Sequence, residues 1–242
     1  MKTQLFKSVL AVTTASIALG SFATQASAVD LTPSEEGEVN VGLDIDGAEY
    51  LDNNSFTFID SIVSEVDAST GSRSRLFIDD LTTQNTYTGG IRLKSKDAGT
   101  NHTGMWFRPS EFADGQSEES GQLEVGTFTF NFNTVFEDLN INWFDTESNN
   151  TTGVTAINGQ TLDSPDWVAK GSNGNIFTQT FANVQSITLK LGNDSPNGTG
   201  DGVNFQLSGN PVPASVPEPA TLGGLAVVGL ALAGRRKLQN RG

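Results

Sequence analysis

Alternation of apolar and polar residues constrains the fold of this chain more than any other feature. Apolar side chains occupy every second position in residues 39–45 and again in residues 139–143. This period of two is typical of a strand with one buried face. Shorter strand-like runs lie at residues 56–59, 76–78, 91–93, 105–107, 187–191 and 203–207. Clusters of Gly, Asn, Asp, Ser and Pro separate them, so the sequence predicts an all-β fold: a single antiparallel β-sandwich or jelly-roll-like domain.

One predicted strand carries a shift in this alternation. In residues 122–132 the apolar side chains occupy odd positions up to Val125 and even positions from Phe128. A β-bulge inserts one residue and would keep both halves facing the same core. Because glycine is common at such irregularities, we expect the bulge at Gly126.

The amino terminus has the pattern of a secretory signal peptide. Two lysines within the first seven residues precede an uncharged, largely apolar stretch at residues 8–23. Ala26 and Ala28 then give the small-x-small form of a signal-peptidase site. We therefore expect a helical targeting segment at residues 1–28 and a mature protein that begins at Val29.

A proline-framed carboxylate lies near the other end of the chain, at Pro217, Glu218 and Pro219. Both prolines lack a backbone donor and push their neighbours out of helical geometry. The tripeptide is therefore extended and accessible to a protease. We assign residues 211–219 to a proline-rich linker.

An uncharged apolar run and a basic cluster follow this linker. Residues 220–233 would span roughly 21 Å as a helix, at ~1.5 Å per residue, against a hydrocarbon core of ~30 Å. Arg235, Arg236 and Lys237 come next and would stay on the cytoplasmic side of a membrane. A buried core helix is the alternative, but core helices seldom end in several cations without carboxylates. The sequence thus predicts a short helical membrane segment at residues 220–234 and a basic tail at 235–242.

The order of these three elements resembles the PEP-CTERM signal of bacterial exosortase systems. In those systems a membrane peptidase cuts near the Pro-Glu-Pro motif and releases or transfers the upstream protein. The resemblance implies two processing partners, a signal peptidase and an exosortase-type membrane peptidase. It also implies an exported protein that the carboxyl-terminal segment anchors only transiently in the membrane. The β-sandwich domain is then expected at residues 29–210.

Composition limits the partners of that domain. The whole chain has 14 basic and 28 acidic residues, and the segments outside 29–216 hold six of the basic residues and one of the acidic residues. The mature part therefore has 8 basic and 27 acidic residues, a net charge of about −19. Such a charge disfavours nucleic acid and anionic lipid as partners, so the membrane is contacted only through the terminal segment. The chain has no cysteine, so its stability comes from an ordinary core.

Three short motifs in the domain suggest a narrower group. They are Leu123-Glu124-Val125-Gly126, residues 143–147 (Trp-Phe-Asp-Thr-Glu) and residues 200–203 (Gly-Asp-Gly-Val). Together they resemble the cyanobacterial LEVG family of PEP-CTERM proteins. That resemblance implies an exported, exosortase-sorted protein with no assigned biochemical activity.

Catalytic signatures are scarce. The single histidine is His102, and the chain has neither a Gly-x-Ser-x-Gly elbow nor a cysteine nucleophile. One imidazole without thiolates cannot form a usual zinc site. We therefore expect no catalytic residues, no cofactor and no enzyme.

One loop is a candidate site for a calcium ion. Asn193, Ser195, Asn197 and Gly198 echo the first half of a calcium-binding loop, and Asp194 and Asp201 add negative charge. The twelfth position is Asn204, where such loops have a bidentate glutamate. The favoured interpretation is a polar turn, with calcium as the alternative.

Tryptophans give a second candidate site. Trp143 is in phase with the buried positions of its strand, whereas Trp106 and Trp167 lie near loops. If they are exposed, these two rings could stack on sugars of an extracellular polysaccharide.

The sequence therefore favours a protein of the cell envelope or extracellular matrix with no defined catalytic activity. A lectin-like, glycan-binding module of the matrix is the second interpretation. An extracellular hydrolase is the third, since no spacing singles out a pair of carboxylates among the many acidic residues.

Overall fold

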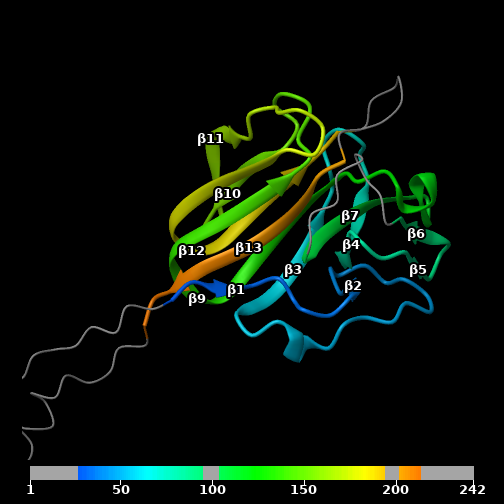
Figure 1. The fold of residues 1–242 in the computed structure, drawn as a ribbon, viewed down its shortest axis with the longest axis horizontal. Helices are drawn as coiled ribbons and strands as arrows, with labels where there is room; N and C mark the ends of the chain where they lie inside the picture. Colours follow the sequence, from blue (N-terminus) through cyan, green and yellow to red (C-terminus); the bar gives the residue numbers. More distant parts are fainter. Residues whose placement is uncertain (1–26, 95–103, 194–201, 214–242) are drawn as a thin grey trace, which may run out of the picture.

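The structure, a computed structural model, describes residues 27–94, 104–193 and 202–213 (Figure 1). This part of the chain is all-β, as the sequence predicts, with two short 3-10 helices, η1 (Asn53–Ser55) and η2 (Glu118–Gly121). The predicted helical targeting segments lie outside the described residues, apart from Ser27 and Ala28. The strands are β1 (Val29–Asp30), β2 (Gly37–Val39), β3 (Ile59–Glu65), β4 (Arg73–Asp80), β5 (Asn85–Tyr87), β6 (Ile91–Leu93), β7 (Met105–Ala113), β8 (Gln116–Ser117), β9 (Gly126–Phe144), β10 (Gly153–Ile157), β11 (Gln160–Trp167), β12 (Ile176–Leu191) and β13 (Asn204–Pro211).

Eleven of these strands form one antiparallel sheet. Its main order is β11-β10-β12-β9-β13-β7-β4-β2. In addition, β3 pairs with β9, β1 with β13, and β8 with β7. The hairpin of β5 and β6 forms a separate two-stranded sheet.

Two long strands, β9 and β12, fold this sheet into two layers. Asn131 pairs with Ser186, and Phe136 pairs with Val184. Between these two pairs β9 advances by five residues and β12 by only two, and this irregularity marks a bend. Before the bend β9 pairs with β3, and after it β9 pairs with β13. The first layer therefore contains β11, β10, the second half of β12, the first half of β9, and β3. The second layer contains the other halves of β12 and β9, then β13, β7, β4 and β2.

Aromatic side chains fill the space between the layers. Phe130 of the first layer packs edge-on against Phe107 and Phe205 of the second, with ring centroids 5.4 and 5.7 Å apart. Phe107 and Phe205 stack on each other at 4.9 Å, and Trp143 lies beside Phe205 at 6.0 Å. All four rings are fully buried. At about 1.5–3 kcal/mol per large buried side chain, such rings dominate the stability of the sandwich.

The predicted bulge at Gly126 is wrong. Gly126 is the first residue of β9 and pairs with Leu191, and the register with β12 continues from there without a shift as far as Asn131. The alternation shifts because the strand begins here, not because a residue is inserted. A Cβ at this position would lie 2.6 Å from the Phe128 ring and 2.9 Å from Cβ of Ser74, so close packing accounts for the glycine.

Two predicted strands are shorter than expected. The alternation at residues 39–45 predicts a strand, but β2 ends at Val39. Asn40 accepts a hydrogen bond from the backbone N–H of Gly42, whose φ of 74° turns the chain. The run at residues 56–59 contributes only its last residue to β3, because the 3-10 helix η1 comes immediately before Phe56.

The two ends of the domain lie side by side. Val29, the predicted mature amino terminus, is the first residue of β1 and pairs with Gly209 of β13 (Figure 1). β13 ends at Pro211, and the N–H of Val212 donates to the carbonyl of Val135 at 2.8 Å. The described part of the chain therefore begins and ends at the same end of the second layer.

Candidate functional site

The outer face of the second layer is divided into two parts, and the first part is covered by other segments of the chain. Phe77 on β4 packs against Ile91 and Leu93 of the β5–β6 hairpin, and its ring lies 4.7 Å from that of Tyr87. The chain around η2 packs beside this hairpin and leads to Glu124. We call this region, the outer face of β4 and β7 beneath the hairpin, the covered half.

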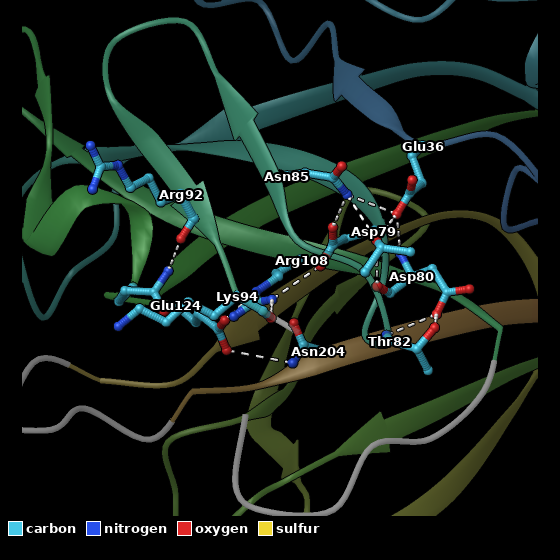
Figure 2. Close-up of polar contacts among 12 residues, drawn as sticks. Glu36, Asp79, Asp80, Thr82, Asn85, Arg92, Lys94, Arg108, Glu124 and Asn204 are labelled. Atoms are coloured by element: carbon cyan, nitrogen blue, oxygen red, sulfur yellow. Dashed lines mark hydrogen bonds and ion pairs between the residues drawn. The ribbon is translucent and has the colours of Figure 1, made fainter. Parts of the chain in front are cut away.

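Arg108 is the centre of a buried polar network in the covered half (Figure 2). Its Nη1 lies 3.0 Å from Oδ2 of Asp79, and its Nε donates to Oε1 of Glu124. The same glutamate accepts a hydrogen bond from Nδ2 of Asn204 at 3.4 Å. Burial raises the pKa of Asp79, although hydrogen bonds from Asn85 and the charge of Arg108 oppose the rise.

A second buried arginine lies on the same face. Nε and Nη2 of Arg75 donate to the two carboxylate oxygens of Glu38 at 2.8 and 2.6 Å. Nη1 of Arg75 donates to the carbonyl of Thr88 at 2.7 Å, which fixes the hairpin cover to the sheet. The guanidinium also lies 5.2 Å from the ring centre of Phe77. Each donor group of this arginine is therefore used to hold structure together.

These contacts make the covered half a structural network. Its carboxylates are compensated by guanidinium groups, and removal of one partner from such a pair is strongly destabilising. Among the described residues, no group of three or more His, Cys, Asp or Glu side chains could hold a metal ion. Of the candidate calcium ligands, only Asn193 is described, and it is half-buried. Asp194, Asn197 and Asp201 lie outside the described residues, as does His102.

A separate cluster joins the loop after β3 to β12. Asp67 is fully buried, and its carboxylate lies 2.7 Å from Nζ of Lys190. The same carboxylate accepts hydrogen bonds from Thr127 Oγ1 at 2.6 Å and from the N–H of Ser69 at 2.8 Å. Burial alone would raise the pKa of Asp67, but Lys190, Ser69 and Thr127 together lower it. The ionised form is thus stabilised, as in a structural ion pair.

Glu111 is another buried carboxylate whose pKa is raised. It is 2% exposed, and its Oε2 accepts a hydrogen bond from Ser74 Oγ at 3.0 Å. Burial raises its pKa, and the negative charge of Asp67 adds to the rise. The protonated form of Glu111 is therefore favoured relative to a glutamate in water.

Trp106 is not exposed, so its ring is not available to stack on a sugar as the sequence suggested. It is 2% exposed and lies on the outer face of β7, in a small cluster with Leu81 and Phe144, 5.6 Å from the Phe144 ring. Trp167 is half-buried at the end of the edge strand β11, opposite Gly153. The sequence places Trp106 near a loop but does not indicate that other side chains cover it on the outer face of β7.

A groove of about 390 Å³ runs between β3 and the segment after β2. Apolar side chains form much of its lining. The N–H of Ser64 on β3 donates a hydrogen bond to the carbonyl of Val41, which joins the two segments next to the groove. Asp60 is the one carboxylate among the described lining residues. The groove thus lacks the carboxylate pair that glycoside hydrolysis requires. Lining residues include Val39, Asn40, Gly42, Phe56, Ile59 and Ile62.

The second part of the outer face carries uncharged polar side chains. Here β12, β9 and β13 lie next to one another (Figure 1), and their outward side chains form rungs across the three strands. Two of these rungs are Thr178–Asn142–Gln206 and Thr180–Asn140–Ser208. We call these two rungs the open half. The sequence did not predict a site here, because these residues are simply the polar positions of alternating strands.

Comparison with known proteins identifies the carboxyl-terminal tail. Residues 215–237 match the model of the PEP-CTERM protein-sorting motif. This match includes Pro217, Glu218, Pro219, Arg235, Arg236 and Lys237, all of which lie outside the described residues. No curated protein and no solved structure matches the chain.

The motif indicates export, carboxyl-terminal anchoring in the membrane and sorting by an exosortase, which is a membrane protease. In the part of the chain that the structure describes, no helix is long and apolar enough to cross a membrane. The predicted membrane segment, residues 220–234, is outside that part. Of the predicted signal-peptidase residues, Ala28 is exposed immediately before β1, and Ala26 is not described.

Proposed function

We propose that this chain is an exported component of the cell envelope or extracellular matrix, without catalytic activity. The match of residues 215–237 to the PEP-CTERM sorting motif carries this proposal. The motif begins four residues after Pro211, the last residue of β13. A folded domain followed closely by the sorting motif suits processing by a membrane peptidase, after which the protein is released or transferred.

The position of the core within the described residues supports this proposal. β1 begins at Val29, and the core includes Val203, immediately before β13, together with Phe205 and Leu207 within β13. Residues 29–212 thus supply both layers of the sandwich and the rings between them. Removal of the tail should leave this core intact.

The LEVG motif also has a structural role in the fold. The carbonyl of Leu123 accepts from the N–H of Glu111, and Glu124 is bound by Arg108. Val125 is buried, and its carbonyl accepts from Ser74 Oγ at 2.6 Å. With the close packing at Gly126, each position of the motif serves the fold. We propose that the chain belongs to the cyanobacterial LEVG family, which it resembles in this motif and in residues 143–147 and 200–203.

A second candidate function, glycan binding, is favoured by the uncharged open half. The third, extracellular hydrolysis, has less support. The buried carboxylates described above are bound by cations or hydroxyl groups, and the groove beside β3 has one carboxylate. We therefore propose that the protein is not an enzyme.

The sorting proposal is tested by fractionation of variants expressed in the native host. Glu218→Ala should leave the unprocessed form in the membrane fraction, because the peptidase loses its recognition site. Deletion of residues 221–242 should release unprocessed, folded protein, because the segment that holds the chain at the bilayer is gone. Glu137→Ala, an exposed glutamate on β9, is the control and should be processed normally.

Limited proteolysis reports whether each variant is folded. A deletion variant that is insoluble or rapidly digested would mean that the apolar run is part of the core. Normal processing of Glu218→Ala would overturn the role of the tripeptide.

A further inference from the structure

We propose that the open half is a binding surface for neutral polysaccharides. This inference deepens the second candidate function, since it names the surface and the class of ligand. It does not depend on the sorting pathway, because the surface lies on the sheet itself. The argument rests on the chemistry of the two rungs, on their hydrogen bonds and on the charge of the surrounding molecule.

The rungs present uncharged groups in a regular array. Thr178 pairs with Asn142 and Asn142 with Gln206 across β12, β9 and β13. Thr180, Asn140 and Ser208 repeat the arrangement two residues along the strands. In sheets the strands are about 4.8 Å apart, and residues two apart on one strand are separated by about 6.8 Å. Hydroxyl and amide groups therefore recur at regular intervals across the three strands.

Hydrogen bonds within the rungs fix the orientation of the amides. Oγ1 of Thr178 donates to Oδ1 of Asn142 at 2.7 Å, and Oγ1 of Thr180 donates to Oδ1 of Asn140 at 2.7 Å. With these oxygens engaged, the N–H groups of both asparagines are the donors that face a ligand. Nε2 of Gln206 donates to the carbonyl of Met105 at 2.9 Å, which leaves its Oε1 as an acceptor. Fixed donors beside fixed acceptors match sugar hydroxyls, which both donate and accept.

The charge of the chain selects a neutral ligand. It has 28 acidic residues against 14 basic ones, yet none of the six side chains in the two rungs is charged. Asp138 lies in the next rung, paired with Ala182 and Asn210, and Asp30 pairs with Ser208 at the border. These carboxylates would repel an anionic polysaccharide but would accept hydrogen bonds from neutral sugar hydroxyls.

The surface is also accessible among the described elements. Thr178 and Thr180 are exposed, and no described strand or helix packs over them. Ile176, on the same face of β12, is 46% exposed and offers an apolar contact for the C–H groups of a sugar ring. A single sugar can contact only part of a site that extends over three strands, so a polysaccharide whose successive units reach both rungs should bind better than a monosaccharide.

The test uses the exported protein, expressed from its complete coding sequence and purified from the envelope or medium of the host. Affinity electrophoresis in gels that contain dextran, galactomannan, hydroxyethyl cellulose or a soluble β-1,3-glucan measures binding to neutral polymers. Alginate serves as the anionic polymer. We expect retardation by at least one neutral polysaccharide and none by alginate.

Variants locate the binding surface. Thr178→Glu with Thr180→Glu should weaken binding at least tenfold, whereas Thr178→Ser with Thr180→Ser should retain it. Gln160→Glu with Thr161→Glu adds two charges at exposed positions of β11 and is the matched control, with no expected effect. Thermal melts confirm that each variant is folded.

Two results would overturn the inference: no retardation of the wild-type protein by any neutral polymer, or equal loss of binding in both glutamate variants. Correct processing at the Pro-Glu-Pro motif together with absent glycan binding would reject this surface and leave the sorting proposal intact. Retardation by alginate alone would also reject it.

Discussion

The covered half and the open half lie on the same face of the same layer, yet they treat charge in opposite ways. Beneath the β5–β6 hairpin, Arg75 and Arg108 are buried and each binds a buried carboxylate. On the neighbouring strands, the rungs of the open half contain no charged side chain. Buried charges on this face are thus paired where they join segments of the fold, whereas the two rungs of the open half carry none.

The difference separates the structural part of the face from the part available to a partner. A buried ion pair is weak evidence of extra stability, but it fixes the position of the segments that supply its two members. In the covered half those segments are β4, β7, the chain around Glu38 and the chain around Glu124. The open half has no covering segment among the described residues, so its side chains can exchange water for a ligand.

Among the changes that test this comparison, loss of one buried arginine should lower the free energy of unfolding the most. Arg108→Met leaves Asp79 and Glu124 buried without their partner, and we expect a loss of about 3–5 kcal/mol in the free energy of unfolding. Arg92→Met, at an exposed position of β6, should change it by less than about 0.5 kcal/mol. Urea denaturation of both variants measures the difference. Equal small effects would show that the covered half is not held by its ion pairs.

The core between the two layers should tolerate added volume poorly at Gly126, which lies in the first layer. A valine there would meet the Phe128 ring and Ser74, so we expect Gly126→Val to cost about 1–3 kcal/mol through overpacking. Gly159→Ala, in the turn between β10 and β11 with nothing within 4 Å of the added Cβ, reports the cost of a positive φ alone. A smaller loss for Gly126→Val than for Gly159→Ala would contradict close packing at the start of β9.

A buried carboxylate held by a hydroxyl group should respond to pH differently from one held by a cation. Because the pKa of Glu111 is raised above its ordinary value of 4.5, the folded protein binds this proton more tightly than the unfolded chain. Stability is therefore lost as pH rises through the folded pKa. Asp67 has a lowered pKa and contributes the opposite trend, but only below its ordinary value of 3.8.

The side chain of the Glu111→Gln variant cannot ionise, so the stability of this variant should fall less than that of the wild type as the pH rises above 4.5. Thermal melts above this pH measure the difference between the two slopes. Parallel curves would mean that Glu111 ionises in the folded protein at no cost.

A charge placed on the open half should have the smallest effect on folding. Thr180→Glu puts a carboxylate at an exposed position, so we expect the free energy of unfolding to change by less than about 0.5 kcal/mol. The same change should impair polysaccharide binding. A loss of several kcal/mol would show that the rung is structural, which would erase the distinction between the two halves.

Sequence reasoning recovered the inner face well and the outer face poorly. Leu139, Ile141 and Trp143 alternate with polar residues and are fully buried, because one face of β9 meets the core. Arg75 and Arg108 occupy polar positions that the alternation predicts to be exposed, yet both are buried. Their strands, β4 and β7, have both faces covered, and the cover comes from a hairpin whose packing no local periodicity encodes.

The same limit explains the two misplaced candidates. Trp106 precedes the core residue Phe107, so it lies on the opposite face of β7, which only the covering segments bury. At Gly126 the change of alternation is real, but a strand start and a bulge produce the same pattern in a sequence. Targeting signals need no tertiary contacts, so the sorting motif at residues 215–237 was found from sequence alone.

Intact-mass spectrometry of the protein recovered from the native host tests the central claim most directly, namely that a folded domain lies between two removable signals. The account predicts a species that begins at Val29 and ends near Pro217-Glu218-Pro219, without the apolar run and the basic cluster. An exported, mature protein that retains residues 1–28 or residues 220–242 would contradict it.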